Sequence, residues 1–373
     1  MDSPLIKAVQ NQDLASKLST VKAERHYDVD WLRIIALGLL IVYHIAISFQ
    51  PWASFIGFMQ NKESLEELWL IMSAINVWRI PILFLISGMG FAFAMRRRNW
   101  KQLLADRTLR ILLPYLFGFF FIAPLNLYFL MQFYGREAAY VPGAWHLWFL
   151  LNIFIYVLML LPFVPLIKTN PENGLFKSIS RLFRLPLGIL LVAIPVVLEA
   201  AVINPDDFPA YAETAHGFWL GFICFVSGFM FILLGQNFWL AVKRHRFITL
   251  GLAATLYALR LLYFELDAPN ALTGFESMSW MLAILGFGAQ HLNKPSKALH
   301  YLSEAVYPVY IIHMPIQYAL SVYLIPLDIS APFKLVLLLA GTFAASFLLF
   351  EILKRLKWIR PLFGMKLNTS RAT

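Results

Sequence analysis

Long apolar runs separated by short polar segments dominate the hydrophobic pattern of this chain. Each run holds about 20 residues, the length that a helix needs to cross a hydrocarbon layer of about 30 Å. The pattern therefore predicts an all-α fold, a polytopic membrane helical bundle with about ten transmembrane helices. The predicted spans cover residues 31–49, 76–95, 109–133, 146–167, 185–203, 217–240, 247–264, 275–290, 303–325 and 335–353.

Composition supports this class of protein. Of the 373 residues, 60% are hydrophobic and only 14% are charged, and the mean hydropathy is +0.67. A soluble protein of this length has too little interior to hide so much apolar surface. The first predicted span is too long for the core of a signal peptide and no small-residue cleavage site follows it, so we expect it to be retained.

Basic residues alternate along the chain in a way that predicts orientation. The segments that share a side with the N-terminus hold 25 of the 31 Lys and Arg residues, whereas the alternate loops hold only Lys62, Arg136 and Lys334. The positive-inside rule then places both termini in the cytoplasm. The net charge of +10 follows from this placement, so it does not indicate nucleic-acid binding.

The chain is therefore expected to be a multi-pass plasma-membrane protein, in the inner membrane if the source is a bacterium. Its predicted organisation is a basic cytoplasmic tail over 1–30, a ten-helix transmembrane domain over 31–353, and a second basic cytoplasmic tail over 354–373. No soluble domain fits between the spans.

The first span carries a stripe of ionisable residues. Arg33 and His44 are eleven residues apart, about three helical turns plus roughly 20°, and Asp30 lies one turn before Arg33 on nearly the same face. Arg33 alone is explained by snorkelling to the interface, but His44 lies roughly 16 Å deeper than Arg33. Ionisable groups at that depth are costly. His44 has either a function or a hydrogen-bond partner on a neighbouring helix.

Other polar residues gather toward the outer half of the predicted bundle. Together they predict a water-accessible cavity there, and Glu199 and Arg260 are expected to pair with each other. The residues lie at the outer ends of spans or near the middle of span nine: Arg79, His146, Glu199, His216, Arg260 and His313.

The segment "RRRNWKQLLADRTLRILLPY" concentrates six basic residues on the expected cytoplasmic side. Arg107 and Arg110 are three residues apart and share a helix face. The positive-inside rule alone explains such a cluster equally well. The functional alternative is a phosphate-binding site, because guanidinium groups match phosphate oxygens.

Four strings, in order along the chain, resemble the acyltransferase-3 family of integral membrane acyltransferases, and within it the glucan biosynthesis protein C type. They are "DWLRIIALGLLIVYH" with its Arg, ten residues, His pattern; "RIPILFLISGMGFAF"; "DRTLRILLPY" with "WHLWFLL"; and "SEAVYPVYIIHMPI" followed by "FEILKRLKWIRPLFGMK".

The resemblance implies transfer of an acyl group, acetyl or succinyl, from a cytoplasmic acyl-CoA donor to a carbohydrate hydroxyl on the outer side of the membrane. His44 is then the catalytic base, with Arg33 and Asp30 along the same channel. Arg107 and Arg110 would hold the phosphates of the co-substrate acyl-CoA, and no bound cofactor or metal is expected.

The same resemblance makes His146 and His313 candidates for contacting the sugar or orienting His44. Arg79, Arg260 and Glu199 remain possible acceptor-site or supporting residues. The alternative function is a transporter or flippase for a lipid-linked or polymeric sugar, because buried ionisable residues also mark transport pathways. Against it, the chain shows no half-and-half repeat with matching broken spans.

Overall fold

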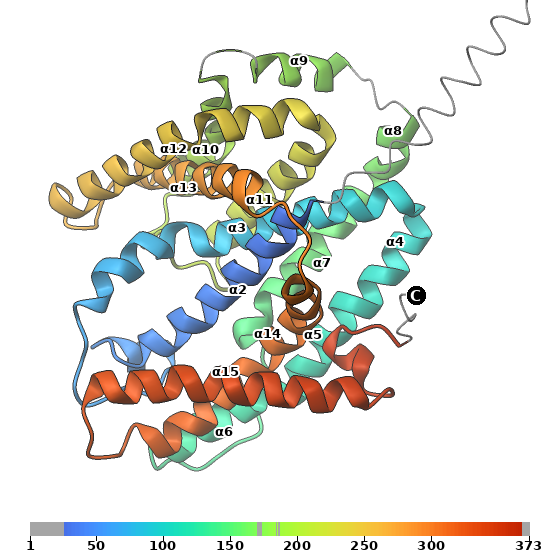
Figure 1. Ribbon diagram of the computed structural model, residues 1–373. Helices are drawn as coiled ribbons and strands as arrows, with labels where there is room; N and C mark the ends of the chain where they lie inside the picture. The colour runs from blue at the N-terminus through green and yellow to red at the C-terminus, as the bar shows by residue number, and fades with distance from the viewer. Residues whose placement is uncertain (1–25, 170–173, 184, 186, 368–373) are drawn as a thin grey trace, which may run out of the picture.

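The computed structural model describes residues 26–169, 174–183, 185 and 187–367, and over these residues it is helical without any β-strand. Most of the predicted tail over 1–30 and the end of the tail over 354–373 lie outside the described residues. The all-α prediction is confirmed for the described chain (Figure 1).

Each predicted span coincides with one or more helices. The helices are α2 (Tyr27–Ile47), α3 (Leu68–Arg97), α4 (Trp100–Arg107), α5 (Leu113–Phe117), α6 (Ala123–Phe133), α7 (Trp148–Leu160), α8 (Val164–Thr169), α9 (Gly174–Leu182), α10 (Ile194–Ile203), α11 (Ala215–Leu234), α12 (Gln236–Leu262), α13 (Asn270–His291), α14 (Lys297–Leu324) and α15 (Ala331–Arg355). Single 3-10 turns are η1 (Ala53–Ile56), η4 (Trp145–Leu147), η5 (Leu161–Phe163), η6 (Gly188–Ala193) and η7 (Arg360–Phe363).

Six helical segments of the described chain are long and apolar enough to cross a membrane. A further apolar segment, Gly188–Ile203, is shorter. The segments therefore support a multi-pass membrane protein, while the predicted count of ten spans stays a prediction. The six segments are Tyr27–Ile47, Leu68–Arg97, Trp100–Phe133, Trp145–Ile167, Ala215–Leu234 and Ala331–Arg355.

Helices α2 and α3 run through the middle of the bundle (Figure 1). Helix α3 packs against α11, and α2 packs against α3, α13, α14 and α15. In Figure 1 α12 and α13 lie on one side of this central pair, and α15 and α6 lie on the other. Because α14 contacts α2, α6 and α15, polar residues of α2 and α14 can meet inside the protein.

Prolines inside two of these helices release backbone carbonyls. Pro81 in α3 has no N–H to give to the carbonyl four residues earlier, on Val77, and Pro315 in α14 leaves the carbonyl of Ile311 in the same state. A buried carbonyl needs another donor. Side chains from other helices supply these donors at the candidate site.

The third predicted span, 109–133, is less regular than expected. Helix α4 begins at the Asn99 capping box, and two π-helical turns then interrupt the chain, η2 (Thr108–Leu112) and η3 (Gly118–Ile122). A π turn inserts one extra residue into a helical turn and so rotates the side chains that follow it. The first of the two turns contains Arg110. The angle between the side chains of Arg107 and Arg110 around the helix axis therefore differs from that in a regular α-helix.

Candidate active site

Three histidines from distant parts of the chain meet inside the bundle. His44 Nδ1 lies 3.1 Å from His313 Nε2, and the ring centroids of His146 and His313 are 5.0 Å apart. His313 Nδ1 lies 2.6 Å from the Tyr310 carbonyl oxygen, and His146 Nε2 lies 3.2 Å from the carbonyl oxygen of Ile311 that Pro315 releases. Thus α2, η4 and α14 each contribute one imidazole to one cluster.

The hydrogen bonds determine which ring nitrogens carry protons. A carbonyl oxygen only accepts, so the Nδ1 of His313 must be the protonated nitrogen of a neutral ring. Its Nε2 is then an acceptor, and the Nδ1 of His44 must donate to it. A neutral His44 consequently has its free lone pair on Nε2, the atom that a general base uses.

The three histidine side chains differ in how much of their surface is exposed. His313 is fully buried and His146 is 8% exposed, whereas His44 keeps an intermediate exposure. The amide of Gln317, one turn beyond His313 on α14, donates to the His44 carbonyl at 2.9 Å. That carbonyl belongs to the last turn of α2, where intrahelical donors run out. The result is a fixed backbone with one accessible imidazole.

A cavity of about 1060 Å³ opens at the basic end of the bundle. Its polar lining includes the predicted residues Asp30, Arg33, Arg107 and Arg110, and its inner wall includes the apolar residue Leu37. Leu37 precedes His44 by seven residues, about two helical turns. The cavity therefore leads from the basic surface toward the histidine cluster.

The cavity wall holds polar atoms that are buried and unsatisfied. Arg107 Nε, Tyr307 Oη and Ser303 Oγ lack hydrogen-bond partners among the described residues, and all three residues line the cavity. Buried polar groups without partners are rare in folded proteins. These atoms are suited to a polar ligand that fills the cavity.

Carboxylates lie next to three of the cavity arginines. Arg110 Nε lies 3.0 Å from one oxygen of Asp106, and Arg107 Nε lies 4.0 Å from the other. Arg33 Nη1 lies 3.7 Å from Asp30, the one-turn pairing that their spacing predicts. These three arginines line one cavity together with four others, Arg96, Arg97, Arg98 and Arg360.

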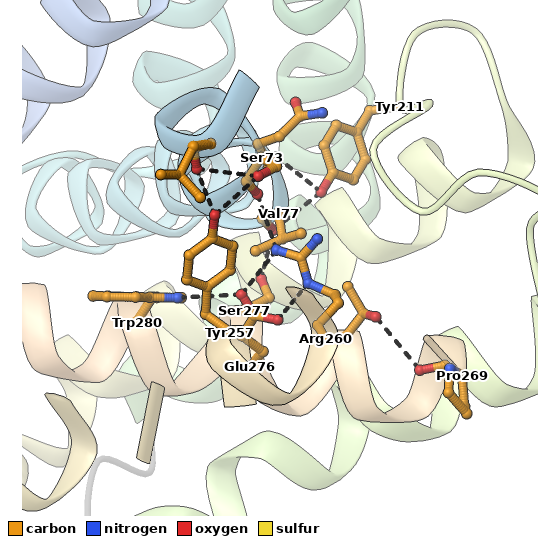
Figure 2. A network of polar contacts seen from close by, with 12 residues as sticks. Ser73, Val77, Tyr211, Tyr257, Arg260, Pro269, Glu276, Ser277 and Trp280 are labelled. Atoms are coloured by element: carbon orange, nitrogen blue, oxygen red, sulfur yellow. Dashed lines mark hydrogen bonds and ion pairs between the residues drawn. The ribbon is translucent and has the colours of Figure 1, made fainter. Parts of the chain in front are cut away.

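Toward the opposite end of the bundle, the expected pairing of Glu199 with Arg260 is wrong. Arg260 on α12 makes two hydrogen bonds to Glu276 on α13, of 2.6 and 3.0 Å, and donates to the Ser73 carbonyl at 2.9 Å (Figure 2). Glu199 lies instead 2.9 Å from the Nδ1 of His216. The pairs follow which helices are neighbours: α12 packs along α13, and α10 packs on α11.

The Arg260–Glu276 pair stabilises the packing of α12 on α13. Both side chains are buried, at 4% and 0% exposure, and the two hydrogen bonds pair the guanidinium charge with both carboxylate oxygens. Removing one member of such a pair leaves an isolated buried charge, which costs about 3–5 kcal/mol of stability. Arg260 is thus occupied inside the protein.

Arg79 differs from Arg260 in this respect. Its guanidinium carbon lies 3.4 Å from the ring centroid of Tyr43, the residue before His44, and one nitrogen donates to the Asn76 side chain at 3.2 Å. Its Nε and Nη1 atoms are buried without a hydrogen-bond partner. In the part of the chain that the structure describes, no carboxylate forms an ion pair with it.

A second cavity, of about 470 Å³, opens at the end opposite to the basic surface. Aromatic side chains, amides and carboxylates line it together: Trp69, Asn76, Asp206, Asp207, Phe208 and Asn270. Burial raises the pKa of Asp207, and nearby His216 partly offsets that increase. Asn76 belongs both to this cavity and to the contact with Arg79, so Arg79 lies between the cavity and the α2 histidine region.

Tyr211 contacts α3 at Val77, a residue that lines this second cavity. Its hydroxyl donates to the Val77 carbonyl at 3.0 Å, which Pro81 leaves without an intrahelical donor, and Ser277 donates to the same oxygen at 2.8 Å (Figure 2). Burial raises the pKa of Tyr211, so its hydroxyl remains a donor. The proline in α3 therefore leaves free the carbonyl oxygen that both hydroxyl groups contact.

Comparison with known proteins identifies the family. A family model described as "Acyltransferase domain" matches residues 26–351. The chain belongs to the acyltransferase-3 family. It is 23% identical over 379 residues to the glucans biosynthesis protein C of Escherichia coli K12, covering 94% of this chain and 97% of that one, and the protein of the same name from Escherichia coli O81 (strain ED1a) is equally similar. No solved structure matches this acyltransferase.

The acyltransferase brings together some of its predicted site residues and separates others. His44, His146 and His313 form one cluster, and Asp30, Arg33, Arg107 and Arg110 line one cavity. Glu199 and Arg260 lie in separate pairs. Sequence reasoning overlooked Glu276, Asn76 and Gln317, although a carboxylate inside the apolar run "FESMSW" was a usable signal for the first.

Proposed function

We propose that this membrane acyltransferase moves an acyl group from an acyl-CoA donor to a carbohydrate hydroxyl, with His44 as the general base. The observation that carries the proposal is the hydrogen bond from His44 to His313. It leaves the His44 Nε2 lone pair free on a partly exposed ring, in the part of the bundle that separates two cavities at opposite ends.

The donor is assigned to the cavity at the basic end, which we expect to face the cytoplasm. Coenzyme A carries several phosphate groups, and guanidinium groups bind phosphate oxygens in a bidentate manner. Arg33, Arg107 and Arg110 supply such groups, and the unsatisfied Tyr307 hydroxyl supplies a further polar contact. The apolar inner wall near Leu37 suits an uncharged pantetheine arm that reaches toward His44.

The acceptor is assigned to the smaller cavity at the other end. Carbohydrates offer hydroxyl groups to amides and carboxylates and apolar ring faces to aromatic side chains. Asn76, Asp206 and Asn270 provide the first kind of group, and Trp69 and Phe208 provide the second. Acetyl and succinyl remain the acyl groups that we expect.

The reaction is a direct acyl transfer. The acceptor oxygen attacks the thioester carbonyl carbon while His44 Nε2 takes the hydroxyl proton. His44 is then an imidazolium whose Nδ1–H still donates to the neutral Nε2 of His313. When the carbon–sulfur bond breaks, the thiolate recovers the proton from His44, which returns to its neutral form.

The experiment compares the envelope carbohydrates of cells with and without the gene by mass spectrometry. Loss of an ester-linked acyl group from one glycan, restored by the wild-type gene, is the expected result. An unchanged ester pattern with loss of the glycan from the outer side of the membrane supports the transporter instead and contradicts this proposal.

A further inference from the structure

Acyl transfer through a tetrahedral intermediate needs a group that stabilises the negative oxygen formed from the thioester carbonyl. The histidine cluster does not provide it in the protonation state described above. His313 donates its only ring proton to the Tyr310 carbonyl, and His146 uses its Nε2 proton on the carbonyl of Ile311. A separate donor is therefore required near His44.

Arg79 has the properties of that donor. It is 8% exposed, and two of its nitrogens, Nε and Nη1, have no hydrogen-bond partner. The remaining contacts position it without neutralising it, since the Tyr43 ring and the Asn76 amide both carry no charge. A buried guanidinium with free donors is costly unless an anion is bound at some stage.

The position of Arg79 agrees with this role. Tyr43, on which the guanidinium stacks, directly precedes His44 on α2. Asn76 links it to the cavity assigned to the acceptor. Arg260, the other buried arginine of this region, lines the acceptor cavity but is already paired with a carboxylate, since it makes two hydrogen bonds to Glu276.

We propose that Arg79 is the oxyanion-stabilising residue of this acyltransferase. When the acceptor hydroxyl attacks, the electron pair of the thioester carbonyl moves onto its oxygen, and Nε and Nη1 of Arg79 donate to that oxyanion. The pair returns to form the ester carbonyl as the thiolate leaves. The inference rests on the proposed acyl transfer and adds a catalytic residue to it.

The positive charge of Arg79 also links formation of the oxyanion to transfer of the proton to His44. The oxyanion and the His44 imidazolium form together, so the net charge of the site stays the same while the guanidinium of Arg79 balances the new negative charge. Arg79 and His44 are therefore expected to act as a unit in which loss of either lowers the rate strongly.

The test measures the steady-state kinetics of the purified full-length protein. The donor is acetyl-CoA or succinyl-CoA, and the acceptor is the glycan before acylation. Arg79→Met should lower kcat about 10²–10³-fold, the effect of removing one oxyanion donor, while KM for donor and acceptor changes little. Hydrolysis of acyl-CoA in the absence of carbohydrate should fall by the same factor, because attack by water forms the same oxyanion. Arg79→Lys should recover part of kcat, since a lysine keeps the charge but not the fork.

Arg246→Met is the matched control, because Arg246 on α12 donates to the Lys243 carbonyl and lines neither cavity, and it should leave kcat close to the wild-type value. If Arg79→Met raises the acceptor KM and leaves acyl-CoA hydrolysis unchanged, Arg79 binds the acceptor and the proposal is overturned. Unchanged kcat overturns it as well. If Arg79→Met does not accumulate in the membrane, Arg79→Lys and Arg79→Gln are assayed for the same two rates.

His44→Asn in the same assay separates this inference from the proposed function. Loss of transfer in His44→Asn with full activity in Arg79→Met contradicts only the role of Arg79. Full activity in His44→Asn contradicts the proposed base and leaves the Arg79 result to be judged on hydrolysis alone.

Discussion

His313 offers the sharpest perturbation of the proposed mechanism, because it contacts the base while it lines neither cavity itself. His313→Leu removes the acceptor for the Nδ1–H of His44. The Nδ1–H then lies buried without a partner, or the proton moves to Nε2 and blocks the lone pair that the reaction needs.

The magnitude follows from the lost contact. In the imidazolium form of His44 this hydrogen bond is charge-assisted and contributes about 1.5–3 kcal/mol, against about 0.5–1.5 kcal/mol while the ring is neutral. The difference of about 1–1.5 kcal/mol is lost only once the proton has moved, so kcat should fall about 5–13-fold through this term alone, since 1.36 kcal/mol is a factor of ten. The unfolding free energy should also fall, by about 1–3 kcal/mol for the unsatisfied donor, although leucine has a similar volume and the helical ladder of α14 still offers the Tyr310 carbonyl the N–H of Met314.

His313→Gln is the matched variant, since the Gln side-chain oxygen accepts a hydrogen bond as the imidazole Nε2 does. Acyl transfer by purified protein, with thermal unfolding measured in parallel, should rank wild type above His313→Gln and His313→Gln above His313→Leu. Equal activity of His313→Leu and wild type would refute the tautomer argument, as would an equal loss in both variants at unchanged stability.

Two further predictions concern the donor side and the orientation. Arg107→Ala should raise the KM for acyl-CoA with kcat little changed, and Arg107→Lys should restore it only partly, because a point charge does not replace a bidentate fork; an unchanged donor KM would leave this arginine a topological role only. Cysteine-accessibility labelling should find a cysteine placed at Asp207 reachable from outside intact cells and one at Lys243 unreachable, and reversed labelling would overturn the assignment of donor and acceptor sides.

The sequence predicted the helical class and the positions of the apolar segments because hydrophobic run length is a direct physical requirement of a bilayer. It also indicated His44, since an ionisable group that deep needs a partner or a task. Each of these two arguments, from run length and from the cost of a buried charge, concerns a single residue or a single helix. They do not depend on how the helices are arranged.

Contacts between helices were less predictable. The mistaken pairing of Glu199 with Arg260 assumed that charges at similar depth meet, whereas α12 packs along α13 and so brings Arg260 to Glu276. The contact from His146 to Ile311 depends on the carbonyl that Pro315 releases. A proline in an apolar run indicates such a carbonyl, but only the packing of the helices tells which side chain reaches it.

The two π turns around Arg110 show the same limit. Spacing on an ideal helix placed Arg107 and Arg110 on one face, and both do line the cavity at the basic end. Their approach to Asp106 nevertheless passes through an irregular turn over Thr108–Leu112. Periodicity assumes a regular helix, so it cannot indicate where the backbone departs from one.

The central claim is that His44 accepts the hydroxyl proton, and the rate of ester formation by His44→Asn tests it most directly. Asparagine keeps hydrogen-bonding capacity and similar bulk but takes up no proton. His245→Asn is the matched control, because His245 is a buried histidine of α12 that bonds only to a carbonyl in its own helix. At equal protein level, His44→Asn should lower ester formation about 10²–10⁴-fold while His245→Asn retains it. Near-wild-type ester formation by His44→Asn at normal abundance would contradict the assignment of His44 as the base.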